Sequence, residues 1–312
     1  MKIGLDVSGG DFAPDSNIKG AIEAQKLLED SQRIVLFGDE TSTRKAIEEA
    51  GSDLSKFDFV HAPECITMHE HPTKAITQKP NSSISKGFEM LKNGEIDSFS
   101  SAGNTGAMLV GAMFSVKTIP GVLRPAIVAN VPKLKEGFGL LLDVGANSDC
   151  KPEMLNQFAI LGSIYAEHVY GISSPKVGLL NIGEEEEKGN NLTISTYPLL
   201  KENSKINFIG NAEGRDLFSD HADVFICDGY TGNVVLKLAE SFYVATLKKG
   251  FKDDFFDRFN YERYGGTPIL GVNAPVIIGH GISNPKAIKN MVLLSRDMIA
   301  SNFIDKIRSA FN

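Results

Sequence analysis

Short apolar runs alternate with longer amphipathic segments along the whole chain. The apolar runs predict strands because they are short, continuous and rich in branched residues. The predicted strands cover residues 2–7, 33–37, 57–61, 97–101, 126–131, 138–143, 176–182, 206–210, 223–227 and 275–279. The predicted helices cover residues 14–29, 41–50, 81–93, 104–117, 152–169, 231–249 and 284–311. Continuous apolar strands that alternate with helices indicate a mostly parallel α/β sheet covered on both faces.

The length of 312 residues allows one large domain or two lobes that share a core. The sequence shows no repeat, low-complexity tract or Pro/Ser-rich linker, so residues 1–312 are treated as a single domain. The net charge of −7 argues against a general affinity for nucleic acid. Only three Cys occur, far apart, which predicts a reducing compartment and no disulfide framework.

The N-terminal residues predict a first strand rather than a signal peptide, because no long apolar region or small-residue cleavage site follows Met1. No stretch approaches the roughly 18 uncharged apolar residues that a membrane span requires. We therefore expect a cytoplasmic protein that is at most peripheral at a membrane surface.

Glycine together with Asn, Asp, Ser or His follows seven of the predicted strands. In an open parallel sheet, the carboxyl ends of the strands form the ligand crevice. Glycine lets the backbone approach a ligand, and helix N-termini supply free N–H groups and a positive dipole for anions. Turn and capping roles explain any single loop of this kind. Seven such loops together favour a binding site for an anionic ligand.

Several familiar motifs are absent, which narrows the chemistry. The sequence contains no G-x-G-x-x-G after a strand, no G-x-x-x-x-G-K-[ST] and no G-x-S-x-G. The run His69-Glu70-His71 with Cys65 has weak ligand spacing, so we interpret it as a surface turn before Pro72 and expect no metal. Cys227 is followed by a carboxylate, which raises a thiol pKa, so a buried structural role is favoured over a nucleophile.

Two long segments resemble a known family. Leu142–Asn147 with Cys150-Lys151-Pro152, and Val177–Asn190 with its four consecutive Glu, closely resemble the PlsX family. Further matching motifs are Ser101–Ala107, Phe208–Asn211, Glu213–Asp216, Cys227–Gly229, Gly232–Lys237, Tyr264–Gly266 and Gly279–Gly281. These motifs occur in one order over essentially the whole chain, which makes the resemblance far more specific than any single glycine loop.

The resemblance implies an acyl-[acyl-carrier-protein]:phosphate acyltransferase. In that reaction inorganic phosphate attacks a long-chain acyl thioester and gives acyl phosphate, which a downstream glycerol-phosphate acyltransferase uses for phospholipid synthesis. The implied fold is a three-layer α/β/α dimer, similar to phosphotransacetylases and to isocitrate and isopropylmalate dehydrogenases. The implied partners are acyl-[acyl-carrier protein], inorganic phosphate and a second copy of the chain, with no cofactor.

Phosphate is itself an oxygen nucleophile, so this reaction needs an anion cradle, positioned reactants and oxyanion donors. We expect Lys188 to neutralise developing charge, Asn233 or His280 to donate to the thioester carbonyl or the leaving thiolate, and Asp228 to orient one of these donors. The residues expected to line the phosphate side are Gly103, Asn104, Thr105, Gly106 and Asn147. The other strand-end residues expected to bind substrate are Asn181, Glu184, Asn211 and Gly229.

An aromatic-rich segment covers about residues 245–264. Phe251, Phe255 and Phe259 recur every fourth residue, which predicts one helical face. That face fits a membrane surface, and it fits a dimer contact or core packing equally well. The carrier protein is acidic, so a local basic patch should receive it. The residues expected to contact the carrier protein or a membrane are Lys248, Lys249, Lys252, Phe255, Phe259 and Arg263.

Three alternatives stay open. A phosphotransacetylase-like enzyme would use short-chain acyl-CoA, and sequence composition does not size an acyl pocket. A second alternative is a nicotinamide dehydrogenase of related fold. The missing glycine fingerprint counts only partly against it, because that fold does not use one. A non-catalytic membrane scaffold would depend on the aromatic segment alone.

Overall fold

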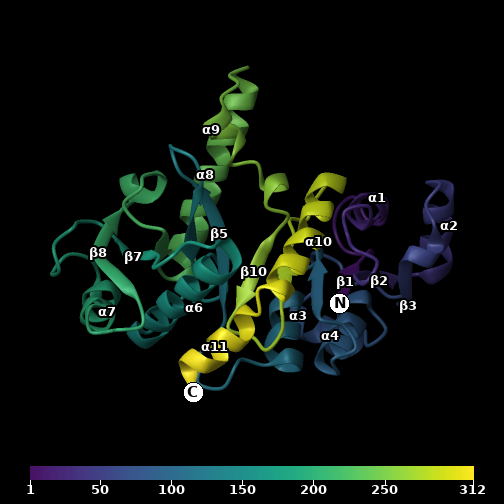
Figure 1. The fold of residues 1–312 in the computed structure, drawn as a ribbon, viewed down its shortest axis with the longest axis horizontal. Helices are drawn as coiled ribbons and strands as arrows, with labels where there is room; N and C mark the ends of the chain where they lie inside the picture. Colours follow the sequence, from purple (N-terminus) through teal and green to yellow (C-terminus); the bar gives the residue numbers. More distant parts are fainter. The chain divides into compact units, whose positions relative to one another are not determined.

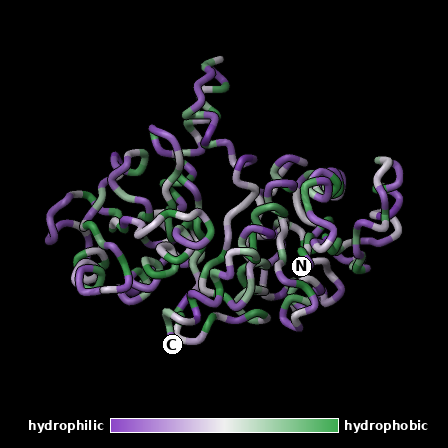
Figure 2. The backbone as a smooth tube through the Cα atoms, in the orientation of Figure 1, coloured by the Kyte–Doolittle hydropathy of each residue, from purple (hydrophilic) through white to green (hydrophobic).

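The computed structural model describes residues 1–312 and divides into two compact units. The first unit comprises Met1–Thr118 and Tyr261–Ala300, and the second comprises Ile119–Asn260 and Ser301–Asn312. Each unit contains its own run of paired strands and its own covering helices (Figure 1). Hydrophobic residues gather along the inner strands of each unit, whereas many outer helices and loops are hydrophilic (Figure 2). No helix combines the length and the apolar character needed to cross a membrane.

The strands of the first unit lie in the order β3-β2-β1-β4-β11-β10. They are β1 (Lys2–Asp6), β2 (Arg33–Gly38), β3 (Phe57–His61), β4 (Ser98–Ser101), β10 (Thr267–Leu270) and β11 (Val276–Ile278). All neighbours are parallel except β10, which runs antiparallel to β11. Leu5 of β1 lies opposite Leu36 and Ser100, so the central strand is paired and buried on both sides.

The helices of the first unit cover both faces of its sheet. They are α1 (Asp15–Gln25), α2 (Glu40–Glu49), η1 (Leu54–Lys56), α3 (Pro72–Gln78), α4 (Ser83–Lys92), α5 (Thr105–Gly111), the π-helix η2 (Ala112–Val116), η4 (Tyr261–Arg263) and α10 (Pro285–Ala300). Crossovers between parallel strands are right-handed, and β1–α1–β2 runs opposite to β3–α4–β4, so α1 and α4 cover opposite faces. Helix α10 packs closely on α1, where a Cβ at Gly20 would lie 2.5 Å from Ile288.

The strands of the second unit lie in the order β5-β6-β9-β7-β8. They are β5 (Ala126–Pro132), β6 (Phe138–Leu142), β7 (Lys176–Asn181), β8 (Asn207–Glu213) and β9 (Val224–Ile226). Strands β5 and β6 form an antiparallel hairpin, and the other pairs are parallel. The helices are α6 (Pro152–Tyr170), α7 (Asn191–Lys201), η3 (Gly214–Phe218), α8 (Gly229–Lys248), α9 (Asp254–Asp257) and α11 (Phe303–Phe311).

The mostly parallel α/β fold predicted from the sequence is confirmed, and each predicted strand is present. Strand β10 was not predicted, because it is short and begins after Gly265-Gly266 with a proline at its second position. The predicted helix over 284–311 is wrong in one respect: it is broken between α10 and α11, where Asn302 has a left-handed φ of 52°. Helix α3, with seven residues, and helix α7, with eleven, were not among the predicted helices.

The predicted continuous helical face over residues 251–259 does not form. Helix α8 ends at Lys248, Gly250 has a φ of +73°, and α9 is only four residues long. The Phe255 and Phe259 rings pack edge-to-face on Phe218, with centroids 5.9 and 5.4 Å away, and Phe259 is only 7% exposed. These two rings therefore belong to the packing of the second unit.

Candidate active site

In the first unit, a buried carboxylate joins the loops that follow β1 and β4. One oxygen of Asp6 accepts hydrogen bonds from the N–H groups of Ser8 and Gly9, at 2.8 and 3.1 Å. The other accepts a hydrogen bond from the Ser101 hydroxyl at 2.6 Å. Burial raises the pKa of the Asp6 carboxyl, although the hydrogen bonds that it accepts act in the opposite direction. A Cβ at Gly9 would lie only 2.8 Å from the Cα of Gly103, so the two loops approach more closely than larger residues allow.

The Asn104 side chain joins the start of α5 to the loop of residues 67–70. Its Oδ1 accepts a hydrogen bond from the N–H of Ala107 at 2.9 Å and so caps α5. Its Nδ2 donates to three carbonyl oxygens between residues 67 and 70, at 2.9 to 3.3 Å. The side chain is thus fully used inside the protein. Thr105 and Gly106 form the first turn of α5, and a Cβ at Gly106 would meet Pro72 at 2.3 Å.

His280 lies in the loop after β11, at the same edge of the first unit's sheet as Asp6. Its ring lies against that of Tyr261, with centroids 4.8 Å apart. The flanking backbone is tied to both neighbouring loops: Gly279 donates to the carbonyl of Ser101 at 2.8 Å, and Gly281 accepts from the N–H of Asp11 at 2.7 Å. The loop conformation is therefore fixed, while the imidazole is half-buried.

A second buried carboxylate, Asp143, organises the loop after β6 in the second unit. It accepts hydrogen bonds from the N–H groups of Ile127, Ala146 and Asn147 and from Nδ2 of Asn147, at 2.7 to 3.1 Å. Burial raises the pKa of the Asp143 carboxyl, and these donors oppose that rise. Asn147 in turn accepts a hydrogen bond from the N–H of Gly229 at 2.8 Å. The predicted residues Asn147 and Gly229 therefore hold the β6 loop against the start of α8.

Asp228 and Asn233 lie at the start of α8 and differ in how far their polar groups are used. Asp228 caps the helix and accepts hydrogen bonds from the N–H and the hydroxyl of Thr231, at 2.9 and 2.7 Å. Asn233 is half-buried beside Gly145, and its carboxamide makes no hydrogen bond in the structure. An amide whose N–H donor is unused within the protein is available to a ligand.

The acidic loop after β7 is held by two asparagines. The Asn181 amide donates to the carbonyl of Lys188 at 3.0 Å, and the Asn211 amide donates to that of Glu185 at 2.8 Å. These bonds close the turn that carries Lys188, whose exposed ammonium group makes no ion pair. The loop therefore presents one free cation.

The neighbouring glutamates of this loop are partly neutralised. Glu184 lies 3.5 Å from Arg215, and Glu186 forms a 2.6 Å ion pair with Lys201. These pairs are exposed, so each contributes little stability. Their effect is to reduce the repulsion that four consecutive glutamates would exert on an anion bound near Lys188.

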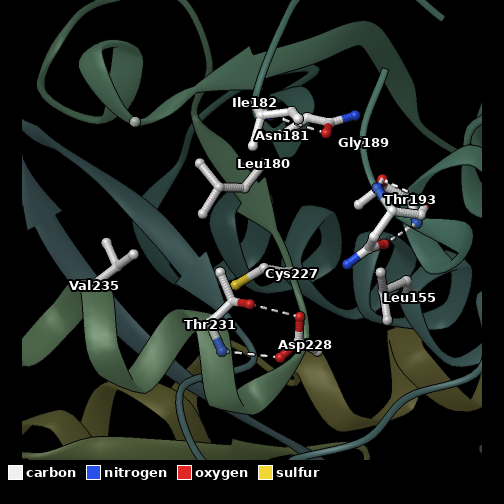
Figure 3. A pocket seen from close by; sticks show the side chains of 12 residues that line it. Leu155, Leu180, Asn181, Ile182, Gly189, Thr193, Cys227, Asp228, Thr231 and Val235 are labelled. Atoms are coloured by element: carbon white, nitrogen blue, oxygen red, sulfur yellow. Dashed lines mark hydrogen bonds between the residues drawn. The ribbon is translucent and has the colours of Figure 1, made fainter. Parts of the chain in front are cut away.

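A cavity of about 420 Å³ opens at this edge of the second unit (Figure 3). It lies among the ends of β7 and β9 and the first turns of α7 and α8. Its lining residues are Leu155, Leu180, Asn181, Ile182, Gly189, Asn190, Thr193, Gly214, Cys227, Asp228, Thr231 and Val235. The structure thus brings the predicted residues Asn181 and Asp228 to one cavity.

The remaining predicted contact residues lie elsewhere. Lys248 and Lys249 are exposed at the end of α8, and Lys252 is exposed in the segment before α9. Arg263 is exposed in η4 of the first unit. No group of three or more His, Cys, Asp or Glu side chains is arranged to hold a metal ion.

Sequence reasoning missed Asp6 and Asp143 as the residues that organise the loops. A signal was present, because both follow a buried strand in the same pattern, Leu-Asp-Val with a glycine close behind. An acidic residue in a strand end that is otherwise apolar needs several donors, and the backbone N–H groups of a glycine-containing turn supply them.

The cysteines are poorly suited to nucleophilic catalysis. Cys227 is buried as predicted, and desolvation raises the pKa of its thiol well above the ordinary value. Burial also raises the pKa of Cys65 to about 11 and that of Cys150 to about 12. The site thus contains no activated thiol.

The chain has full-length relatives among known proteins. Residues 1–306 match the family described as "Fatty acid synthesis protein". The chain is 43% identical to a phosphate acyltransferase from Dictyoglomus turgidum, covering 100% of this chain and 98% of the relative. It is 44% identical to a phosphate acyltransferase from Desulforamulus reducens, covering 99% and 97% of the two chains.

Solved structures with a similar fold include two phosphotransacetylases. The EutD phosphotransacetylase from Staphylococcus aureus has a TM-score of 0.66 at 15% identity and covers 96% of this chain and 94% of its own. A phosphotransacetylase from Streptococcus pyogenes has a TM-score of 0.69 at 15% identity, with the same coverage. At this identity the likeness concerns the fold alone, and it confirms the predicted similarity to phosphotransacetylases.

The raised thiol pKa values predict slow modification of the native protein. At pH 8, Cys65 and Cys150 are almost entirely protonated, so reaction with 5,5′-dithiobis(2-nitrobenzoic acid) should be roughly 100-fold slower than for an ordinary thiol. The rate should rise steeply with pH up to about pH 11. Urea-unfolded protein is the control, and all three of its thiols should react quickly with the reagent. A native thiol that reacts as fast as the unfolded control would contradict the prediction.

Proposed function

The chain belongs to the phosphate acyltransferase family of fatty acid synthesis proteins, and we propose that it transfers a long-chain acyl group from acyl-carrier protein to inorganic phosphate. The observation that carries the proposal is the edge of the second unit's sheet. An apolar cavity opens there, the start of α8 carries an unused amide, Asn233, and the loop after β7 carries a free cation, Lys188. These are the groups that attack by a bound anion on a thioester requires.

The chemical step follows from these residues. A phosphate oxygen attacks the thioester carbonyl carbon, the carbonyl oxygen becomes an oxyanion, and the C–S bond then breaks to release the carrier thiolate, which takes up a proton. Asn233 donates a hydrogen bond to the oxyanion. Lys188 offsets the charge of phosphate as it approaches the carbonyl. No protein acyl intermediate is formed, in keeping with the raised thiol pKa values.

Other residues act by holding these groups in place. Asp143 and Asn147 fix the β6 loop, against which Asn233 rests. Asp228 caps the helix that carries Asn233. Asn181 and Asn211 close the turn that carries Lys188. The roles of His280 as a donor to the thiolate, and of residues 103–106 in binding phosphate, stay predictions.

The function is tested by phosphate-dependent release of carrier thiol from palmitoyl-carrier protein, with palmitoyl-CoA and acetyl-CoA as controls. The expected product is an acyl phosphate that hydroxylamine traps. Release from acetyl-CoA alone would assign the protein to the short-chain phosphotransacetylase class instead. Binding to vesicles without turnover of any thioester would favour a scaffold.

Lys188→Ala and Asn233→Ala should each lower kcat/KM by about 100- to 1,000-fold, the usual cost of removing a donor or a charge that acts on the transition state. Lys188→Arg should retain part of the activity because it keeps the charge. Lys92→Ala, an exposed lysine of α4, is the matched control and should be unchanged. Near-normal rates in the first two variants, with the fold intact, would remove these residues from the mechanism.

We propose that the basic residues at the end of α8 receive the acidic carrier protein. Lys248, Lys249 and Lys252 are exposed within five positions of one another on a chain of net charge −7, and the exposed Asp253 and Asp254 that follow offset part of their charge. Changing all three to Glu should raise the KM for palmitoyl-carrier protein about 10-fold, more strongly at low salt. The KM for palmitoyl-CoA, measured alongside, should move far less. Equal changes for both substrates would exclude a carrier-specific role.

We also propose that α8 pairs with its counterpart in a second copy of the chain. Tyr230, Val234, Leu238 and Phe242 recur every fourth residue and are 43–69% exposed, so α8 carries an unpaired apolar stripe. A helix stripe that packs on its own copy satisfies twofold symmetry. Phe242→Asp should convert a dimer into a monomer in sedimentation velocity. A wild-type monomer that binds anionic vesicles through this stripe would support the membrane interpretation instead.

A further inference from the structure

Most polar side chains that line the cavity at the edge of the second unit are already hydrogen-bonded within the protein. Asp228 is bonded to Thr231, and Asn190 exchanges hydrogen bonds with Thr193. The Asn181 amide donates to the carbonyl of Lys188 and accepts from the N–H of Ile182. Figure 3 shows the two hydrogen bonds between Thr231 and Asp228 at the cavity. A ligand with many amides or hydroxyls would lose its hydrogen bonds to water on entering and find few replacements.

The remaining surface of the cavity is apolar. Leu155 of α6, Leu180 of β7, Val235 of α8 and Cys227 of the loop after β9 contribute side chains. Ile182 lies at the rim and is 80% exposed, although it follows a buried strand. A volume of about 420 Å³ falls within the roughly 300–1,000 Å³ typical of sites for small ligands. These features match a hydrocarbon chain.

We propose that this cavity binds the acyl chain of the thioester and that Val235 sets the chain length accepted. The proposal rests on the proposed function, because it assigns a place to the chain of that substrate. The polar rim then receives the thioester end, near Asn181, whose amide is bonded to the backbone of Lys188. The apolar interior receives the chain.

Val235 is singled out because it lines a second space as well. That space is a small void of about 10 Å³, lined by Leu141, Leu217, Phe218, Leu236, Ala239, Phe259 and parts of β5. Leu141, Leu217 and Phe259 are at most 7% exposed, so the surroundings of the void belong to the packed core of the unit. Val235 therefore stands between the open cavity and the core, where its size limits how far a chain penetrates.

Val235→Phe fills the inner end of the cavity, and Val235→Ala extends it toward the void. In Val235→Phe, the ratio of kcat/KM for palmitoyl over octanoyl thioesters should fall by roughly 10-fold or more, because a chain that no longer fits loses the contacts of several methylenes. In Val235→Ala, the ratio for stearoyl over palmitoyl thioesters should rise. Val244→Phe makes the same change at an exposed position of the same helix and should leave both ratios unchanged.

Two outcomes would overturn the inference. An unchanged chain-length ratio in folded Val235→Phe would do so, and so would an equal loss of activity for every chain length. Should Val235→Phe fail to fold, Val235→Ala decides, since an unaltered stearoyl ratio would reject the assignment.

A binding measurement separates this inference from the proposed reaction. Fluorescence of 11-(dansylamino)undecanoic acid should rise with wild-type protein, be reversed by palmitate and weaken at least about 10-fold in Val235→Phe. If no thioester is turned over but the probe binds in this pattern, the reaction is wrong and the acyl site stands. If turnover is normal and the probe binds equally to both proteins, the reaction stands and the site is wrong.

Discussion

Two buried carboxylates determine the form of the candidate site. Asp6 and Asp143 each end an apolar strand, one in each unit, and each accepts hydrogen bonds from the loop that follows. Leaving such an acceptor unpaired inside a protein costs about 1–3 kcal/mol or more, so the loops are held where the donors meet it. In the second unit the restraint extends to α8, because the Asn147 carbonyl accepts a hydrogen bond from the N–H of Gly229, where α8 begins.

The arrangement separates polar side chains that are hydrogen-bonded within the protein from those that are not. Most asparagine and aspartate side chains at the strand ends are used to close turns, as Asn104, Asn181 and Asp228 are. Asn233 and Lys188 stand apart because nothing in the protein engages their amide and ammonium groups. A reaction in which phosphate is the nucleophile needs only a few such groups, provided that the scaffold does not let them move.

Sequence patterns predicted the fold well, because continuous apolar runs and amphipathic segments have few alternatives to a parallel α/β sheet. They failed where chain direction depends on a single residue, as at Asn302 between α10 and α11 or at Gly250 after α8. The structure brings several of the predicted strand-end residues together, such as Asn181 and Asp228 at one cavity. Which of the polar residues at the strand ends are used internally depends on hydrogen bonds between distant segments, such as Asn104 with the carbonyls at 67–70, and sequence spacing does not report those.

The first unit is made of two separate stretches of the chain, which bears on how the protein is synthesised. Strand β4 gains its neighbour β11, and α1 gains its neighbour α10, only after residues 261–300 have left the ribosome. Until then β4 has an unpaired edge and α1 an uncovered face, while nearly all of the second unit is already available to fold. Open edges of this kind are prone to pairing with other chains. Residues 1–118 therefore keep an open sheet edge and an uncovered helix face until β11 and α10 have been synthesised.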